Sequence, residues 1–91
     1  AAYLLSKKTL AELVKMLALS LAPSVRVNAV APGLILPPEG KGRDHLKGLA
    51  RAVPLRRSGR IEDVIRTVRF FIESDYVTGQ IIFVDGGEHL S

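Results

Sequence analysis

The 91-residue sequence predicts a layered α/β fold with a parallel sheet. Two segments with helical periodicity alternate with two short apolar segments that have the composition of strands, and most connections are short. The second apolar segment, Ile81–Val84, has no polar residue in alternation, which is typical of a parallel strand covered on both faces. Two strands alone leave unpaired edges and an uncovered apolar face, so we expect further strands from outside this chain.

The first helix is expected from about Tyr3 to Leu21. Apolar residues recur there at helical spacing, namely Leu10, Leu13, Val14, Leu17 and Leu21. Further apolar residues widen this stripe, so the helix is expected to be buried on more than one side and to face another subunit in part. Pro23 ends it.

The first strand is expected at Val25–Val30, and Ala31–Gly33 ends it. The segment 34–42 contains two prolines and two glycines and is expected to be a loop. Within it, residues 36–43 have the composition of a lid that closes over a substrate. Asp44 is suited to cap a short helix that ends near Arg51.

The second long helix is expected at Ile61–Glu73. Its apolar face consists of Val64, Ile65, Val68, Phe71 and Ile72. Thr78–Gly79 is expected to form a turn, Gln80–Val84 the second strand, and Asp85–Gly87 the turn that closes it.

Composition excludes several classes of site. Hydrophobic residues make up 47% of the chain and charged residues 24%, which is typical of globular core material. The chain has no cysteine, which rules out disulfides and thiolate metal sites and fits a reducing compartment such as the cytoplasm. No apolar run approaches the roughly 20 residues of a membrane span, so we expect no membrane insertion. His45 and His89 lack partners at ligand spacing, so we expect both at the surface and no metal site.

The net charge of +4 does not indicate nucleic-acid binding. The cations are spread along the whole chain, and aromatic residues make up only 5% of it. Single-strand binders combine a basic groove with aromatic stacking platforms, which this pattern lacks.

The pair Tyr3 and Lys7 carries the chemistry of the sequence. Residues at i and i+4 are neighbours on a helix. A cation at that distance favours the phenolate and lowers the pKa of a tyrosine from its usual value of about 10. Such a tyrosine can donate a proton to a substrate near neutral pH. The same spacing also occurs between solvated surface residues, so the pair alone does not establish a site.

Four ordered motifs resemble the C-terminal half of the short-chain dehydrogenase/reductases. They are Tyr3–Lys7, Arg26–Gly33, Val53–Arg57, and Val77–Gln80 with Val84–Gly87. The resemblance implies a Rossmann-like doubly wound parallel sheet, of which this chain supplies the C-terminal helices and the last two strands. Residues 1–91 would then be the C-terminal portion of a single reductase domain whose N-terminal nucleotide-binding half is absent. A chain that opens at Ala1 without methionine agrees with this expectation.

The resemblance also implies an NAD(P)H-dependent oxidoreductase. The expected cofactor is NADP, and NAD stays open because the residue that selects between them lies in the missing half. Tyr3 would be the general acid, and Lys7 would lower the tyrosine pKa and hold the nicotinamide ribose. The nicotinamide carboxamide would be bound by Pro32 and Gly33 together with the backbone of Leu34 and Ile35.

Within the family, Pro32–Leu34 and the loop after it look most like pteridine reductases. A 3-ketoacyl-carrier-protein reductase-like enzyme is the alternative, as is a catalytically inactive binding or scaffold member of the same fold. Many family members place a threonine where this chain has Pro37, so that cofactor contact is lost or replaced. The catalytic serine of the family and its glycine-rich phosphate turn are not in this sequence, so we expect the isolated chain to be inactive.

The expected partners are the N-terminal portion of the same protein and a small carbonyl or imine substrate. By resemblance we also expect a homo-oligomer, a dimer or tetramer. Several other polar residues are expected to be structural: Ser6, Asn28, Arg56, Arg57, Arg60 and the Asp85–Gly87 turn.

Overall fold

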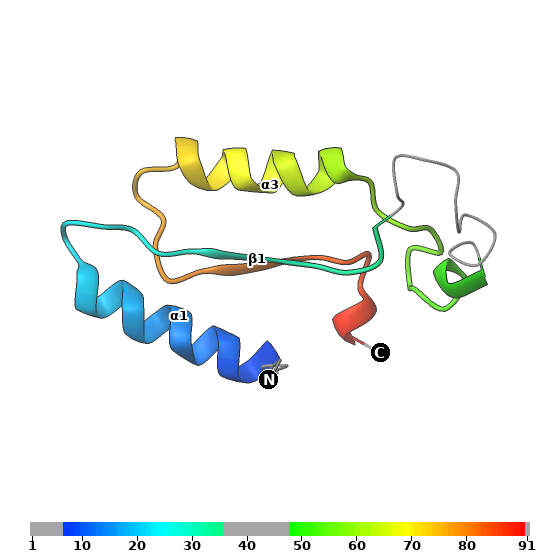
Figure 1. Ribbon diagram of the computed structural model, residues 1–91, viewed down its shortest axis with the longest axis horizontal. Coiled ribbons are helices and arrows are strands. Elements are labelled where there is room, and N and C mark those ends of the chain that lie inside the picture. The colour runs from blue at the N-terminus through cyan, green and yellow to red at the C-terminus, as the bar shows by residue number, and fades with distance from the viewer. Residues whose placement is uncertain (1–6, 36–47, 91) are drawn as a thin grey trace, which may run out of the picture.

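The structure, a computed structural model, describes residues 7–35 and 48–90. In these ranges the chain forms α1 (Lys7–Leu21), β1 (Ala29–Pro32), α3 (Ile61–Glu73), β2 (Ile81–Val84) and the short 3-10 helix η1 (Glu88–Leu90). A helical turn covers residues 48–50. The two strands lie between α1 on one side and α3 on the other (Figure 1). The predicted α/β layering is therefore confirmed.

The two strands pair in parallel, as the unalternating apolar run predicts. Ala29 lies opposite Ile81, and Pro32 lies opposite Val84. Backbone hydrogen bonds extend the pairing at both ends. Ala29 N–H donates to the Gln80 carbonyl at 2.9 Å, and Gly33 N–H donates to the Val84 carbonyl at 3.1 Å. The carboxyl ends of both strands consequently meet at one edge.

The first strand begins later than the prediction of Val25–Val30 and includes residues that were expected to end it. Before the strand, Val27 N–H donates to the Thr78 hydroxyl at 3.1 Å, while the Val27 carbonyl accepts from Gly79 N–H at 2.7 Å. At the end, Pro32 has no N–H to donate, but the next donor in the ladder is Gly33, so the pairing continues past the proline.

Asn28 is structural, as predicted. Its amide nitrogen donates to the Val77 carbonyl at 2.9 Å, and its amide oxygen accepts from Gln80 N–H at 3.0 Å. The side chain thus ties the approach to β1 to the turn that precedes β2. That turn contains Gly79 with a φ of 76°, a conformation that glycine adopts without steric cost.

Helix α1 ends at Leu21, as predicted before Pro23, and the expected residues Tyr3–Ser6 lie outside the described ranges. Val14 and Ala18 are buried, and a Cβ at Gly79 would lie 3.5 Å from that of Ala18. Leu10 and Ala11 are half-buried, whereas the larger apolar side chains from Leu13 to Leu21 are 41–81% exposed. The helix therefore covers the sheet with a narrow strip of its wide apolar surface.

Helix α3 has the predicted bounds, Ile61–Glu73. Its start is fixed by Asp63, whose carboxylate accepts from Arg60 N–H at 2.8 Å while its own N–H donates to the Arg60 carbonyl at 2.9 Å. The hydrogen bond from Arg60 N–H lowers the pKa of Asp63 below its usual value, and the charges of Arg60, Arg57 and Arg66 act in the same direction. Asp63 therefore favours the helix in its ionised form.

The apolar face of α3 is only partly covered. Phe71 is buried, whereas Ile65, Val68 and Ile72 remain 42–69% exposed. Among the described residues no large side chain falls below 2% exposure. The core between these elements is therefore thin, as expected of a two-stranded sheet.

Arg26 closes the other end of α3. Its guanidinium donates to the carbonyls of Phe71 at 2.8 Å and Ser74 at 2.9 Å. The last carbonyls of a helix have no partner within the helix and carry partial negative charge, so a cation there satisfies both needs. Arg26 thereby connects the segment before β1 to the helix after it. Within the described ranges no helix is both long and apolar enough to cross a bilayer.

We expect Arg26→Ala to lower the free energy of unfolding by about 1.5–3 kcal/mol, because it removes charge-assisted hydrogen bonds to the helix end. Urea denaturation of the purified protein measures this change. Arg69→Ala is the matched control, since it removes an exposed guanidinium from the middle of α3. An equal loss in both variants would contradict the capping role.

Candidate functional site

The predicted catalytic pair is described only in part. Tyr3 lies outside the described residues, and Lys7 is the first residue of α1. Helix α1 runs against the direction of the strands, so its N-terminal end lies on the side of the layer to which the carboxyl ends of β1 and β2 point (Figure 1). The predicted lid, Pro37, Asp44 and His45 also lie outside the described ranges.

The predicted carboxamide-binding segment, Pro32–Ile35, lies at this carboxyl edge. Gly33, Leu34 and Ile35 are partly buried, and Pro32 is exposed. The Leu34 carbonyl accepts from Gly59 N–H at 2.8 Å, and Ile35 forms a parallel bridge with Gly59. The segment leaves the strand at Pro32, bends at Leu34 and is held beside the loop that leads into α3.

Gly33 allows a close backbone approach, as the sequence predicts, and the approaching backbone belongs to this chain. A Cβ at Gly33 would lie 2.6 Å from the Cβ and 3.0 Å from the Cα of Asp85. Both distances are shorter than ordinary van der Waals contact, so no side chain fits there without a shift of the backbone. The end of β1 and the end of β2 are thus packed directly against each other.

Asp85 and His89 form the polar centre of the turn that follows β2. The Asp85 side chain is 2% exposed and accepts hydrogen bonds from Gly87 N–H and His89 N–H, each at 3.0 Å. The His89 Nδ1 lies 2.9 Å from Asp85 Oδ2. The His89 ring also stacks on Phe83 of β2, with centroids 4.2 Å apart and ring planes inclined by 14°.

Opposing effects act on the charge of Asp85. Burial raises the pKa of its carboxyl group, but the hydrogen bonds from Gly87 and from the backbone and ring of His89 outweigh this effect. The pKa of Asp85 therefore lies below its usual value of 3.8. An ionised carboxylate with several donors is what stabilises this turn.

The loop at residues 53–59 packs against the same turn. Leu55 N–H donates to the Gly86 carbonyl at 3.0 Å, and a Cβ at Gly86 would lie 2.8 Å from a methyl carbon of Val53. Gly86 and Gly87 have φ values of 62° and 92°, which glycine adopts readily. Arg56 also has a positive φ, 57°, which is uncommon for a residue with a Cβ.

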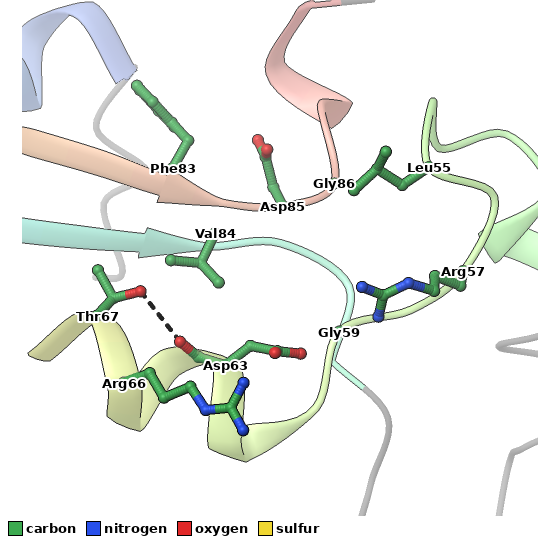
Figure 2. Close-up of a pocket in the computed structure, with 10 residues that line it drawn as sticks. All are labelled: Leu55, Arg57, Gly59, Asp63, Arg66, Thr67, Phe83, Val84, Asp85 and Gly86. Carbon is green, nitrogen blue, oxygen red and sulfur yellow. Dashed lines mark hydrogen bonds between the residues drawn. The ribbon is translucent and has the colours of Figure 1, made fainter.

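A cavity of about 350 Å³ lies on the α3 side of this edge. Figure 2 shows Arg57, Asp63 and Arg66 around it, while the Asp85 carboxylate points to the other side of the strand. Thr67 donates its hydroxyl hydrogen bond to the Asp63 carbonyl at 3.0 Å. Arg57, expected to be structural, thus lines a cavity next to the loop that holds Leu34.

Sequence reasoning missed the pairing of Asp85 with His89. His89 is exposed, as expected, but its side chain, 29% exposed, contacts two residues of the β2 end. The signal in the sequence is an Asp-Gly-Gly turn followed by a histidine at i+4 from the aspartate. Over residues 7–35 and 48–90, no group of three acidic or histidine side chains is placed to hold a metal ion.

Comparison with known proteins identifies relatives over nearly the whole chain. The family model described as Enoyl-(Acyl carrier protein) reductase matches residues 1–89. A Streptomyces violaceoruber protein that carries the name of a ketoacyl reductase of the granaticin polyketide synthase is 48% identical over 84% of this chain and 32% of its own length. The Bacillus subtilis short-chain dehydrogenase/reductase homolog YusR is 36% identical over 97% of this chain and 69% of its own length.

Solved structures show the same architecture. The FolM alternative dihydrofolate reductase 1 from Brucella canis, complexed with NADP, aligns with a TM-score of 0.79 and 42% identity. The alignment covers 94% of this chain and 33% of that one. The chain spans about a third of the length of most curated relatives it matches. The predicted Rossmann-like fold, with this chain as its C-terminal helices and last two strands, is thereby confirmed.

We expect Gly33→Ala to lower the free energy of unfolding by about 1–3 kcal/mol, because the added methyl group has no room beside Asp85. The urea midpoint of the purified protein measures the change. Gly48→Ala is the matched control, because a Cβ at Gly48 meets nothing within 4 Å. A Gly33→Ala protein as stable as the control variant would show that the two strand ends are not in direct contact.

The stability of the protein should depend on pH through Asp85. Its pKa in the folded state is depressed, so its contribution is present above the pKa of the unfolded chain and is lost as pH falls through the folded value. Urea midpoints measured between about pH 6 and pH 2.5 should fall less steeply in Asp85→Asn than in the wild type. Parallel curves for the two proteins would contradict this account.

Proposed function

The chain belongs to the short-chain dehydrogenase/reductase family, and we propose that it is the C-terminal portion of an NADPH-dependent reductase. In this proposal residues 1–91 belong to a single Rossmann-fold domain, and the N-terminal nucleotide-binding half of that domain is a separate part of the same protein. Tyr3 is the general acid, and Lys7 lowers its pKa and holds the nicotinamide ribose.

One observation carries this proposal. The N-terminal end of α1, which begins at Lys7, lies on the side of the layer where β1 ends in the Pro32–Ile35 segment (Figure 1). Ligands of open α/β sheets bind outside the carboxyl ends of the strands. The two parts of the chain to which the sequence assigns cofactor contacts therefore face the same region.

The Pro32–Ile35 segment is suited to a flat polar group such as the nicotinamide carboxamide. Its backbone is contacted by Gly59 on one side and by Asp85 on the other, which restricts its conformation before a ligand binds. Leu34 and Ile35 keep part of their surface accessible. A bound nicotinamide cofactor supplies the hydride, and the chain orients it through this segment and through Lys7.

The role of Tyr3 follows from its expected position one helical turn from Lys7. The ammonium group favours the phenolate, so the phenol releases its proton more readily than free tyrosine does. The proton passes to the substrate atom next to the one that accepts hydride. A neutral residue at position 7 would leave the phenol a poor acid at neutral pH.

NADP is the cofactor that we propose, because the FolM structure that this chain resembles is complexed with NADP. NAD is the alternative, and comparing the dissociation constants of NADPH and NADH decides between them.

For the substrate we propose a pteridine, on the 42% identity to the FolM alternative dihydrofolate reductase.

A ketoacyl thioester is the second candidate substrate, on the 48% identity to the protein named for a ketoacyl reductase. Turnover of a dihydropterin and of an acetoacetyl thioester, each with NADPH, separates the two. A third candidate is a catalytically inactive member of the family that binds nucleotide without turnover. Binding of NADPH without reduction of either substrate would favour it.

The exposed apolar faces of α1 and α3 support two kinds of partner. Met16 and Leu19 on α1, and Ile72 on α3, are each more than 60% exposed. We propose that the N-terminal portion of the same protein covers part of these faces and that a second copy covers another part, giving a dimer or tetramer. The absence of cysteine supports the cytoplasm as the compartment.

In the protein that includes the N-terminal portion, we expect Tyr3→Phe to lower kcat by about 10²–10⁴-fold and to leave the dissociation constant of NADPH within about twofold, because it removes the proton donor and keeps the ring. Steady-state turnover and fluorescence titration of NADPH measure the two quantities. Tyr76→Phe, which alters the other tyrosine of the chain at a fully exposed position, is the control. Equal activity in the Tyr3→Phe and wild-type proteins would refute the assigned role.

A further inference from the structure

The turn after β2 contacts the proposed cofactor segment at Gly33. Gly33 has space for only a hydrogen on the side that faces Asp85. Its N–H donates to the carbonyl of Val84, the residue before Asp85. Asp85 therefore cannot move towards Gly33 unless Gly33 moves as well.

Asp85 is itself held by several contacts within its own turn. Its carboxylate accepts from two backbone N–H groups of the same turn and lies within hydrogen-bond distance of the His89 ring. The His89 ring stacks on Phe83, which lies opposite Ala31 in the β1–β2 pairing. The turn is thus connected to β2 in two ways. Asp85 follows Val84 directly in the chain, and the His89 ring stacks on Phe83.

The two stacked rings lie on opposite sides of Asp85 in the sequence. Phe83 precedes Asp85 by two residues, and His89 follows it by four. Because the ring stack closes this short loop, Asp85 cannot rotate away from Gly33 without breaking either the stack or the carboxylate hydrogen bonds.

We propose that Asp85 and His89 are positioning residues that hold the Pro32–Ile35 segment in the geometry that binds the nicotinamide end of the cofactor, an inference that rests on the proposed function. Neither residue touches the cofactor in this account. They act through Gly33, by fixing where the backbone of Leu34 and Ile35 lies. Displacement of a binding group by about 1 Å can cost a factor on the order of 10² in rate, so a small shift suffices.

The test uses His89→Phe, which keeps a ring to stack on Phe83 and removes the bond to Asp85, and Asp85→Asn, which removes the charge at nearly the same shape. Leu90→Ala, at an exposed neighbouring position, is the control. The full-length proteins are titrated with NADPH and with 2′-phospho-ADP-ribose, which lacks the nicotinamide. We expect both variants to bind NADPH about tenfold more weakly and 2′-phospho-ADP-ribose as well as the wild type does.

Two outcomes would overturn the proposal. NADPH affinity equal to that of the wild type would show that the turn does not position the segment. An equal loss of affinity for both ligands would show a general structural role instead, because the second ligand makes no contact with the nicotinamide segment.

A separate measurement distinguishes a failure of this proposal from a failure of the proposed function. A wild-type protein that does not bind NADPH contradicts the proposed function, and the positioning is then measured in the ligand-free protein by amide hydrogen exchange. The Gly33 amide should exchange at least about tenfold faster in His89→Phe, while the Ala29 amide, bonded to Gln80 at the far end of the pairing, keeps its rate. An unchanged Gly33 rate, or an equal rise at both amides, would overturn the inference.

Discussion

The parallel pairing of β1 with β2 is the constraint on which the other features of this edge depend. Because both strands run in one direction, Pro32 and Val84 end side by side, and the residues after them leave the sheet at the same place. Gly33 and Asp85 can therefore pack against each other although they are far apart in the sequence. The loop into α3 then closes over both, through Gly59 on Leu34 and through Leu55 on Gly86.

The pattern of nearby residues was sufficient to predict the bounds of elements that are determined by nearby residues. The bounds of α3 follow from its apolar periodicity and from Asp63, which lies three residues after Arg60. The start of β1 did not follow from local pattern. Val27 bonds a hydroxyl 51 residues away, and no propensity of the segment itself indicates that contact. The same holds for His89, because its role depends on the conformation of two glycines between it and Asp85.

The candidate site was likewise predictable from the sequence only in part. The sequence identified Pro32–Ile35 by motif, and the structure adds what contacts the segment, which is the backbone of Gly59 on one side and the Cα and Cβ of Asp85 on the other. Aspartate is a residue type that often serves as a metal ligand or a catalytic acid. In the structure the oxygens of Asp85 are occupied by donors of its own turn and by His89. These hydrogen bonds stabilise the turn that packs against the end of β1.

The close contact at Gly33 also bears on how sequences of relatives can be interpreted. A glycine there is required by packing within the chain, whether or not a nucleotide is ever bound. A relative that has lost its catalytic residues would still be under selection to keep this glycine, because any larger residue would push two strands apart. Retention of the glycine in a family member is accordingly expected of an intact fold, whether or not that protein still binds a cofactor.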